Sequence, residues 1–143
     1  MEIRTLSVND ARAMAAIERQ IFSTPWSVNM CRAELANIYS CYWGAFEDYD
    51  LIAYAGLNIV AGEEGHITNV AVLPGHRRSG IAKRLIYEML GLDMRMYTLE
   101  VRESNAAAIA LYNSFGFEIL GKRKNYYYSP AEDALIMTKE MTL

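Results

Sequence analysis

The fold of this chain is decided by one stretch, Val70-Ala71-Val72-Leu73-Pro74-Gly75-His76-Arg77-Arg78-Ser79-Gly80-Ile81-Ala82-Lys83. Its apolar beginning predicts a strand, Pro74-Gly75 predicts a turn, and the apolar stripe after Gly80 predicts a helix over residues 80–90. The first turn of a helix presents unpaired backbone N–H groups and about half a positive charge. Cationic side chains at positions 77, 78 and 83 surround this helix start. The sequence therefore indicates a loop that binds a pyrophosphate group.

The residue pattern of this loop excludes two common phosphate-binding motifs. A Walker A loop requires a lysine after its second glycine, whereas Ile81 follows Gly80, and no GxGxxG sequence occurs in the chain. Gly80 and Ala82 are small enough to let a phosphate approach the backbone closely. A basic surface turn, in which Gly80 only starts the helix, would give the same pattern, so the residues alone leave both interpretations open.

Strands and helices alternate on both sides of the loop. The patterns predict helices over residues 11–22, 27–37, 80–90 and 106–115, strands over residues 2–6, 41–46, 51–60, 66–73, 96–101, 117–120 and 134–142, and a polar, tyrosine-rich connection over residues 122–133. The order β-α-α-β-β-β-α-β-α-β-β predicts a mixed α/β sheet in a single domain, residues 1–143, with parallel strands on either side of the third helix. Ligands bind such sheets beyond the carboxyl ends of the parallel strands, here near Val72 and Val101.

Composition argues against several classes of function. The chain has 143 residues, of which 52% are hydrophobic, enough for one core. Its formal net charge of −3 gives no electrostatic attraction to nucleic acid or to an anionic membrane, and no apolar run reaches the roughly 18 residues of a membrane span. We therefore expect a cytoplasmic protein that binds neither. Cys31 and Cys41 are not spaced with His66 or His76 as metal ligands are, so we expect no metal site and no disulfide.

Two motifs resemble a known family. Arg78-x-x-Gly80-x-Ala82 resembles the [RQ]-x-x-G-x-[GA] signature of the GCN5-related N-acetyltransferase (GNAT) superfamily. Residues 99–117, Leu-Glu-Val-Arg-Glu-Ser-Asn-Ala-Ala-Ala-Ile-Ala-Leu-Tyr-Asn-Ser-Phe-Gly-Phe, are similar to the ribosomal-protein-alanine N-acetyltransferases of RimI type, as are Pro25-Trp26-Ser27 and the later residues 123–127 and 132–137. The resemblance covers nearly the whole chain. It implies the GNAT fold, acetyl-CoA as co-substrate and the N-terminal alanine of a small-subunit ribosomal protein as acceptor.

The resemblance also implies roles for individual residues. One strand pairs through its backbone with the pantetheine arm of the coenzyme, the loop and helix start hold the pyrophosphate, and an asparagine makes a further contact. The coenzyme-binding positions implied are Val70, Ala71, Val72, Arg77, Arg78, Ser79, Gly80, Ile81, Ala82, Lys83 and Asn105. Glu100 matches a proposed general base, and Tyr112 matches a tyrosine proposed to protonate the departing thiolate.

The chemistry of these two residue types fits such roles to different degrees. A tyrosine, with an ordinary pKa of about 10, is protonated at neutral pH and can donate to a thiolate. A glutamate, with an ordinary pKa of about 4.3, is a weak base unless burial raises its pKa. Without the resemblance, the pattern favours an exposed strand position for Glu100 and explains Tyr112 equally well as a core residue of a helix.

Aromatic residues are candidates for the acceptor side of the site. Trp26, Tyr126 and Tyr127 offer apolar walls, and the tyrosines add hydroxyl groups, although packing on a closing strand explains the tyrosines equally well. We predict an enzyme that acetylates a protein N-terminus, with a basic ribosomal protein as its partner. Other protein N-termini, small amines, and coenzyme binding without turnover are the alternative hypotheses.

Overall fold

Seven strands form one mixed sheet in the computed structural model, which describes residues 1–141. The strands are β1 (Glu2–Thr5), β2 (Ser40–Glu47), β3 (Asp50–Val60), β4 (Glu64–Val72), β5 (Met96–Arg102), β6 (Glu118–Tyr128) and β7 (Ala131–Glu140). Their order in the sheet is β1-β2-β3-β4-β5-β7-β6, and among these strands only β4 and β5 run parallel. The predicted mixed sheet and its parallel pair are confirmed.

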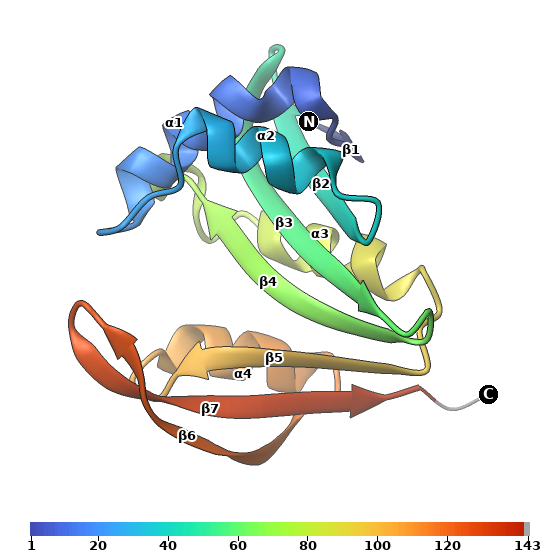
Figure 1. Ribbon diagram of the computed structural model, residues 1–143, viewed down its shortest axis with the longest axis vertical. Helices are drawn as coiled ribbons and strands as arrows, with labels where there is room; N and C mark the ends of the chain where they lie inside the picture. The colour runs from blue at the N-terminus through green and yellow to red at the C-terminus, as the bar shows by residue number, and fades with distance from the viewer. Residues whose placement is uncertain (142–143) are drawn as a thin grey trace.

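Four α-helices within residues 1–141 cover the two faces of the sheet. They are α1 (Ala11–Ile21), α2 (Val28–Ala36), α3 (Ile81–Leu90) and α4 (Ala106–Ser114), with short 3-10 turns η1 (Val8–Asp10) and η2 (Pro74–His76). Figure 1 shows α1 and α2 on one face and α3 and α4 on the other. Polar side chains start two of these helices: Ser27 Oγ accepts a hydrogen bond from Met30 N at 3.1 Å, and Asn105 Oδ1 accepts one from Ala108 N at 3.1 Å.

Each face of the sheet has its own apolar core. On one face, residues of α3 such as Leu85 and Met89 pack with Leu99 of β5. On the other face, Met14 and Ile17 of α1 pack with residues of β2, β3 and α2. The spacing of the buried residues follows the helical period, which explains why each helix lies flat against the sheet. No helix in residues 1–141 has the length and hydropathy needed to cross a membrane.

The C-terminal strands are longer than the sequence predicted. Strands were expected over residues 117–120 and 134–142, with a connection between them. Instead β6 extends to Tyr128 and β7 begins at Ala131, so most of the tyrosine-rich segment belongs to a long hairpin. β6 lies at the edge of the sheet and is exposed along nearly all its length, and its pairing with β7 is interrupted twice. An exposed, interrupted strand has no regular alternation of apolar residues, which is why the pattern failed. Position 142 lies outside the described residues.

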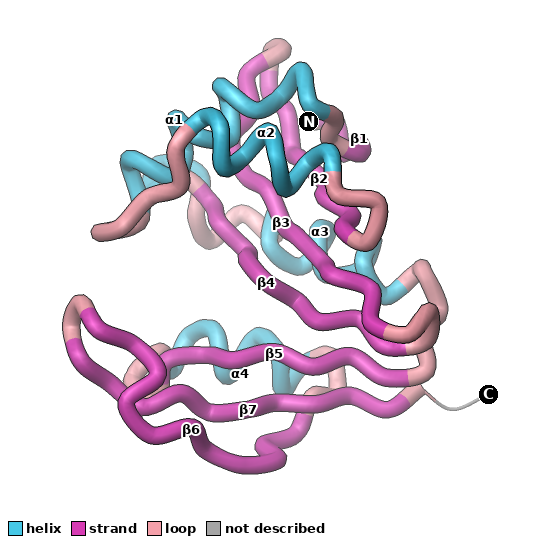
Figure 2. The backbone as a smooth tube through the Cα atoms, in the orientation of Figure 1, coloured by secondary structure: helices cyan, strands magenta, loops and turns pink. Residues whose placement is uncertain are grey.

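β4 and β5 separate halfway along their length. Their pairing runs only from Glu64 with Met96 to Ile67 with Leu99, and beyond that point the two strands diverge (Figure 2). The divergence coincides with a β-bulge in β4, because Gly56 of β3 pairs with Asn69 and the next residue of β3 pairs with Ile67, which leaves one residue of β4 unpaired. Backbone groups of β4 beyond the bulge therefore face a gap where β5 would otherwise pair with them.

Candidate active site

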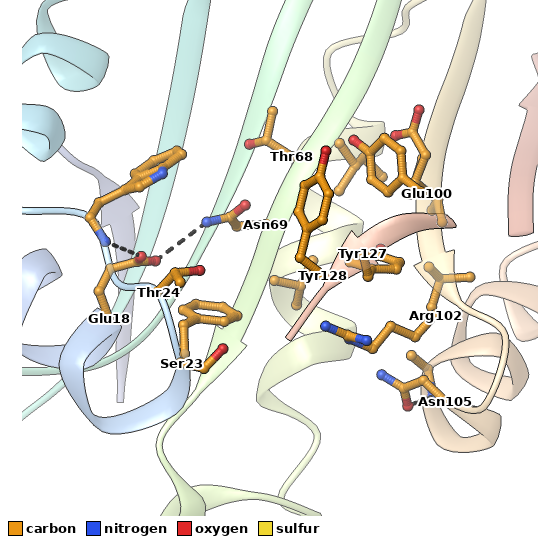
Figure 3. Close-up of a pocket in the computed structure, with 18 of the residues that line it drawn as sticks. Glu18, Ser23, Thr24, Thr68, Asn69, Glu100, Arg102, Asn105, Tyr127 and Tyr128 are labelled. Atoms are coloured by element: carbon orange, nitrogen blue, oxygen red, sulfur yellow. Dashed lines mark hydrogen bonds between the residues drawn. The ribbon is translucent and has the colours of Figure 1, made fainter. Parts of the chain in front are cut away.

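A cavity of about 780 Å³ lies where β4 and β5 diverge. It is lined by Glu18, Phe22, Ser23, Thr24, Trp26, Ile67, Thr68, Asn69, Val70, Leu99, Glu100, Val101, Arg102, Asn105, Ala108, Tyr112, Tyr126, Tyr127 and Tyr128. Figure 3 shows Glu18 and Asn69 on one side of this cavity and Glu100, Arg102 and Asn105 on the other. The position agrees with the expectation that a ligand binds beyond the carboxyl ends of the parallel strands.

Glu18 is a buried carboxylate in the wall of this cavity. Only 2% of the residue is exposed. Its carboxylate accepts hydrogen bonds from the Tyr54 hydroxyl, from Trp26 N at 2.9 Å and from Asn69 Nδ2 at 3.4 Å. Burial and the hydrogen bond to Glu18 raise the pKa of Tyr54, so this tyrosine stays protonated and keeps donating. Glu18 thereby ties the loop between α1 and α2 to strands β3 and β4.

Glu100 is held by partners on both sides of its carboxylate. His66 Nε2 lies 2.5 Å from Glu100 Oε2, and Arg123 Nε lies 3.6 Å from Oε1. The Glu100 side chain is 14% exposed and borders the cavity. Neighbours on β4 and β6 thus fix the orientation of the Glu100 carboxylate. A carboxylate must be held in one orientation if it is to act on a bound substrate.

Tyr112 reaches the cavity from α4. The residue is buried, and its ring packs edge-on against Phe117 with 5.7 Å between ring centroids. Burial, with a smaller contribution from Tyr127, raises the pKa of Tyr112 to about 12. The hydroxyl therefore carries its proton at every physiological pH and is suited to donate it rather than to accept one.

Two loops meet at the mouth of the cavity. Arg102 donates to Pro130 O at 2.9 Å and to Glu132 Oε1 at 3.2 Å, and its guanidinium group lies 4.2 Å from the centre of the Tyr127 ring. From the other side, Ser23 Oγ donates to Ser129 O at 3.3 Å. The tip of the β6–β7 hairpin is therefore fastened both to β5 and to the loop that follows α1.

A second, smaller cavity of about 270 Å³ lies at the start of α3. It is lined by Val72, His76, Arg77, Arg78, Gly80, Ile81, Ala82, Lys83, Ala107 and Leu111. Gly80 precedes the helix with a φ of +81°, in the left-handed region that favours glycine. Arg77 Nε donates to Val72 O at 3.0 Å, which folds the loop back onto the end of β4. Unpaired N–H groups of the helix start and two further cations, Arg78 and Lys83, thus border one concave surface.

Most residues that the sequence singled out border these two cavities. The first cavity includes Val70, Glu100, Asn105, Tyr112, Trp26, Tyr126 and Tyr127, and the second includes Val72, Arg77, Arg78, Gly80, Ile81, Ala82 and Lys83. Two predicted residues border neither. Ala71 is 2% exposed and packs in the core under α1, and Ser79 Oγ donates to His76 O at 2.5 Å within the loop. Their side chains shape the site from outside it.

Sequence reasoning missed several cavity residues. Glu18 carried a detectable signal, because it lies seven residues after Ala11 and four after Met14 on the buried stripe of α1, where a charged side chain breaks the apolar pattern. Asn69 and Arg102 are polar residues on strands, where polar and apolar side chains commonly mix, and gave no comparable signal. Their contribution depends on how β4 and β5 diverge, which no local pattern encodes.

Comparison with known proteins decides the family. A family model described as the acetyltransferase (GNAT) family matches residues 11–117. The chain belongs to the GNAT family. A putative ribosomal protein bS18-alanine N-acetyltransferase of Bacillus subtilis is 36% identical over 140 residues, which cover 94% of this chain and 92% of that protein. An uncharacterized protein of Mycobacterium leprae is 38% identical over 96% of this chain, which spans only 40% of that relative's length.

A solved structure agrees with the sequence relatives. The crystal structure of the ribosomal-protein-S18-alanine N-acetyltransferase from Escherichia coli matches this GNAT chain with a TM-score of 0.90 at 30% identity, over 99% of this chain and 94% of that chain. The predicted family, fold and enzyme class are confirmed: the chain is an acetyl-CoA-dependent N-acetyltransferase of the GNAT family.

Proposed function

We propose that this GNAT enzyme transfers the acetyl group of acetyl-CoA to the N-terminal α-amine of a ribosomal protein, with alanine as the acetylated residue. One observation carries the proposal: β4 beyond its pairing with β5 borders two cavities, one that contains Glu100 and Tyr112 and one that contains the start of α3. The acceptor follows the names of the Bacillus subtilis relative and the Escherichia coli structure. Residues 1–143 would form one catalytic domain that works in the cytoplasm, where ribosomal proteins are made.

The smaller cavity is the proposed site of the coenzyme phosphates. The pyrophosphate would bind the N–H groups at the start of α3, with Arg78 and Lys83 as counter-charges. The pantetheine arm would pair with the backbone of β4 from Val70 to Val72, where β5 no longer supplies partners. Asn105 would add a contact from the start of α4, since its Oδ1 caps that helix and the residue borders the larger cavity.

The larger cavity is the proposed site of the acceptor N-terminus. Its walls combine tyrosine rings with two carboxylates, Glu18 and Glu100, a composition that suits an ammonium group followed by a polypeptide. An α-amine has an ordinary pKa of about 8 and a lysine side chain about 10.4, so presenting a neutral lysine at pH 7 costs about 3 kcal/mol more. A terminal amine is therefore the easier acceptor.

Two side chains, Glu100 and Tyr112, carry the protons in the proposed transfer. Glu100 takes a proton from the incoming ammonium group, directly or through a water molecule, and the neutral nitrogen attacks the thioester carbon. Backbone N–H groups of β4 beyond the bulge stabilise the resulting oxyanion. As the carbon–sulfur bond breaks, Tyr112 protonates the sulfur and regains a proton from the nitrogen. Each turnover leaves the acetylated amine, free coenzyme A and one proton on Glu100.

The test is acetyl-CoA-dependent mass gain on peptides that begin Ala-Arg. Matched peptides carry the same sequence with a blocked α-amine and a free lysine. A single acetyl group on the free α-amine alone supports the proposal. Transfer to lysine or to small amines, with the α-amine left unmodified, would overturn the acceptor, and coenzyme binding without transfer to any amine would overturn the enzymatic role of the site.

A further inference from the structure

His66 lies outside the larger cavity but contacts a residue inside it. His66 belongs to β4 and Glu100 to β5, and the two side chains meet at 2.5 Å across the last part of the parallel pairing, where His66 is the partner of Thr98. Glu100 borders the cavity, whereas His66 is not among the residues that line it. The His66 side chain is 32% exposed, against 14% for Glu100. This pair therefore connects the interior of the cavity with solvent.

The proposed reaction leaves a proton on Glu100 that must reach solvent. Because the acceptor arrives as an ammonium ion, each turnover leaves one net proton on Glu100. Acceptor and coenzyme occupy the cavity at that moment, so the proton needs a way out that does not lead through them. The contact between Glu100 Oε2 and His66 Nε2 is a hydrogen bond along which a proton can move.

The other ionisable groups that face the pair cannot take over this task near neutral pH. Arg123 of β6 lies 3.6 Å from Glu100 Oε1, and an arginine keeps its proton in proteins. Tyr127 of β6 is close enough for the charge of Glu100 to contribute to its pKa, which burial raises to about 12, so it neither accepts nor releases a proton at pH 7. An imidazole is the side chain that exchanges protons in this range.

We infer that His66 is a positioning residue that holds Glu100 and carries its proton to solvent. The Glu100 O–H bond breaks as an N–H bond forms at His66 Nε2, and the resulting imidazolium releases one proton to water. Exchange of the exposed ring with water restores the tautomer that can accept at Nε2. This role rests on the proposed function, because it uses the proton which amine acetylation leaves behind.

The experiment compares His66→Gln, His66→Ala, Glu100→Gln and the His66→Ala/Glu100→Gln double variant. Glutamine can donate a hydrogen bond to Glu100 but cannot accept and release a proton near pH 7. We expect kcat to fall about tenfold or more in both His66 variants, a modest part of what proton transfer usually contributes, while the KM for acetyl-CoA stays unchanged. Since His66 acts through Glu100, the double variant is expected to be no slower than Glu100→Gln alone.

Small imidazole buffers supply the decisive readout. They are expected to restore the rate of His66→Ala, with a restored rate that rises with the basicity of the buffer, and to leave Glu100→Gln and the double variant unrestored. A native kcat in His66→Gln, additive losses in the double variant, or restoration that ignores buffer basicity would each overturn the role of His66. If the native chain acetylates no amine, the proposed function fails instead, so the two failures are distinguishable.

Discussion

Gly80 and Gly62 form a matched pair for testing the phosphate-binding loop. Gly80 has a φ of +81° before α3, and Gly62 has a φ of +72° in the turn between β3 and β4. A Cβ added at either position meets no atom within 4 Å. The cost of an alanine is therefore backbone strain alone, about 1–2 kcal/mol for a left-handed residue that is not glycine. Both variants should lower the melting temperature, by roughly 2–8 °C for a chain of this size.

Only one member of the pair borders the smaller cavity. Because Gly80 lines it and Gly62 does not, Gly80→Ala should also weaken acetyl-CoA binding, by about tenfold or ~1.4 kcal/mol if the methyl group keeps the pyrophosphate from the helix start. Thermal unfolding gives the stability of each variant, and calorimetric titration at a temperature where both are folded gives the affinity. Equal acetyl-CoA affinity in the two variants would refute the assignment of this loop to the pyrophosphate.

Further predictions concern the larger cavity. Tyr112→Phe should lower kcat by about tenfold or more while leaving the Kd for acetyl-CoA unchanged, and an unchanged kcat in steady-state assays would remove the hydroxyl from the mechanism. An unfolded tyrosine ionises near pH 10, whereas burial raises the pKa of Tyr112 in the fold to about 12. The free energy of unfolding should therefore fall between pH 10 and 12, and urea titrations should show a smaller fall in Tyr112→Phe than in the native chain. Glu18→Gln leaves either the Tyr54 hydroxyl or Trp26 N without an acceptor, so the free energy of unfolding in urea should fall by about 1–3 kcal/mol. A variant as stable as the native chain would contradict this role of the Glu18 hydrogen bonds. Arg102 fastens the β6–β7 hairpin through Pro130 and Tyr127, so Arg102→Met should raise the KM for the acceptor peptide about tenfold and leave the KM for acetyl-CoA unchanged. A parallel rise in both KM values would show a general loss of structure instead.

The loop before α3 could be predicted because its signals are local. A Pro-Gly turn, the start of an apolar helical stripe and clustered cations all lie within a few residues of sequence, and Gly80 adopts the positive φ that favours glycine before the helix. The same holds for the helix that Asn105 starts. From the sequence alone, these signals predict where the proposed coenzyme side of the candidate site lies.

The acceptor side could not be predicted in the same way because its contacts join distant segments. Ser23 meets Ser129, and Arg102 meets Pro130, through contacts that bridge more than 25 positions of the chain. The length of β6 was missed for a related reason, since an edge strand with two interruptions shows no alternation. Glu18 is intermediate: its place on an apolar stripe was visible, but the donors that satisfy it lie on other elements.

The short pairing between β4 and β5 has a consequence for the protein inside a cell. The ladder that joins the two halves of the sheet consists of four residue pairs, from Glu64 with Met96 to Ile67 with Leu99. A ligand that binds the folded chain and spans the gap beyond them adds to folding stability in proportion to the logarithm of its free concentration. The resistance of this enzyme to unfolding and proteolysis would then follow the supply of acetyl-CoA, so that its abundance reports the metabolic state of the cell.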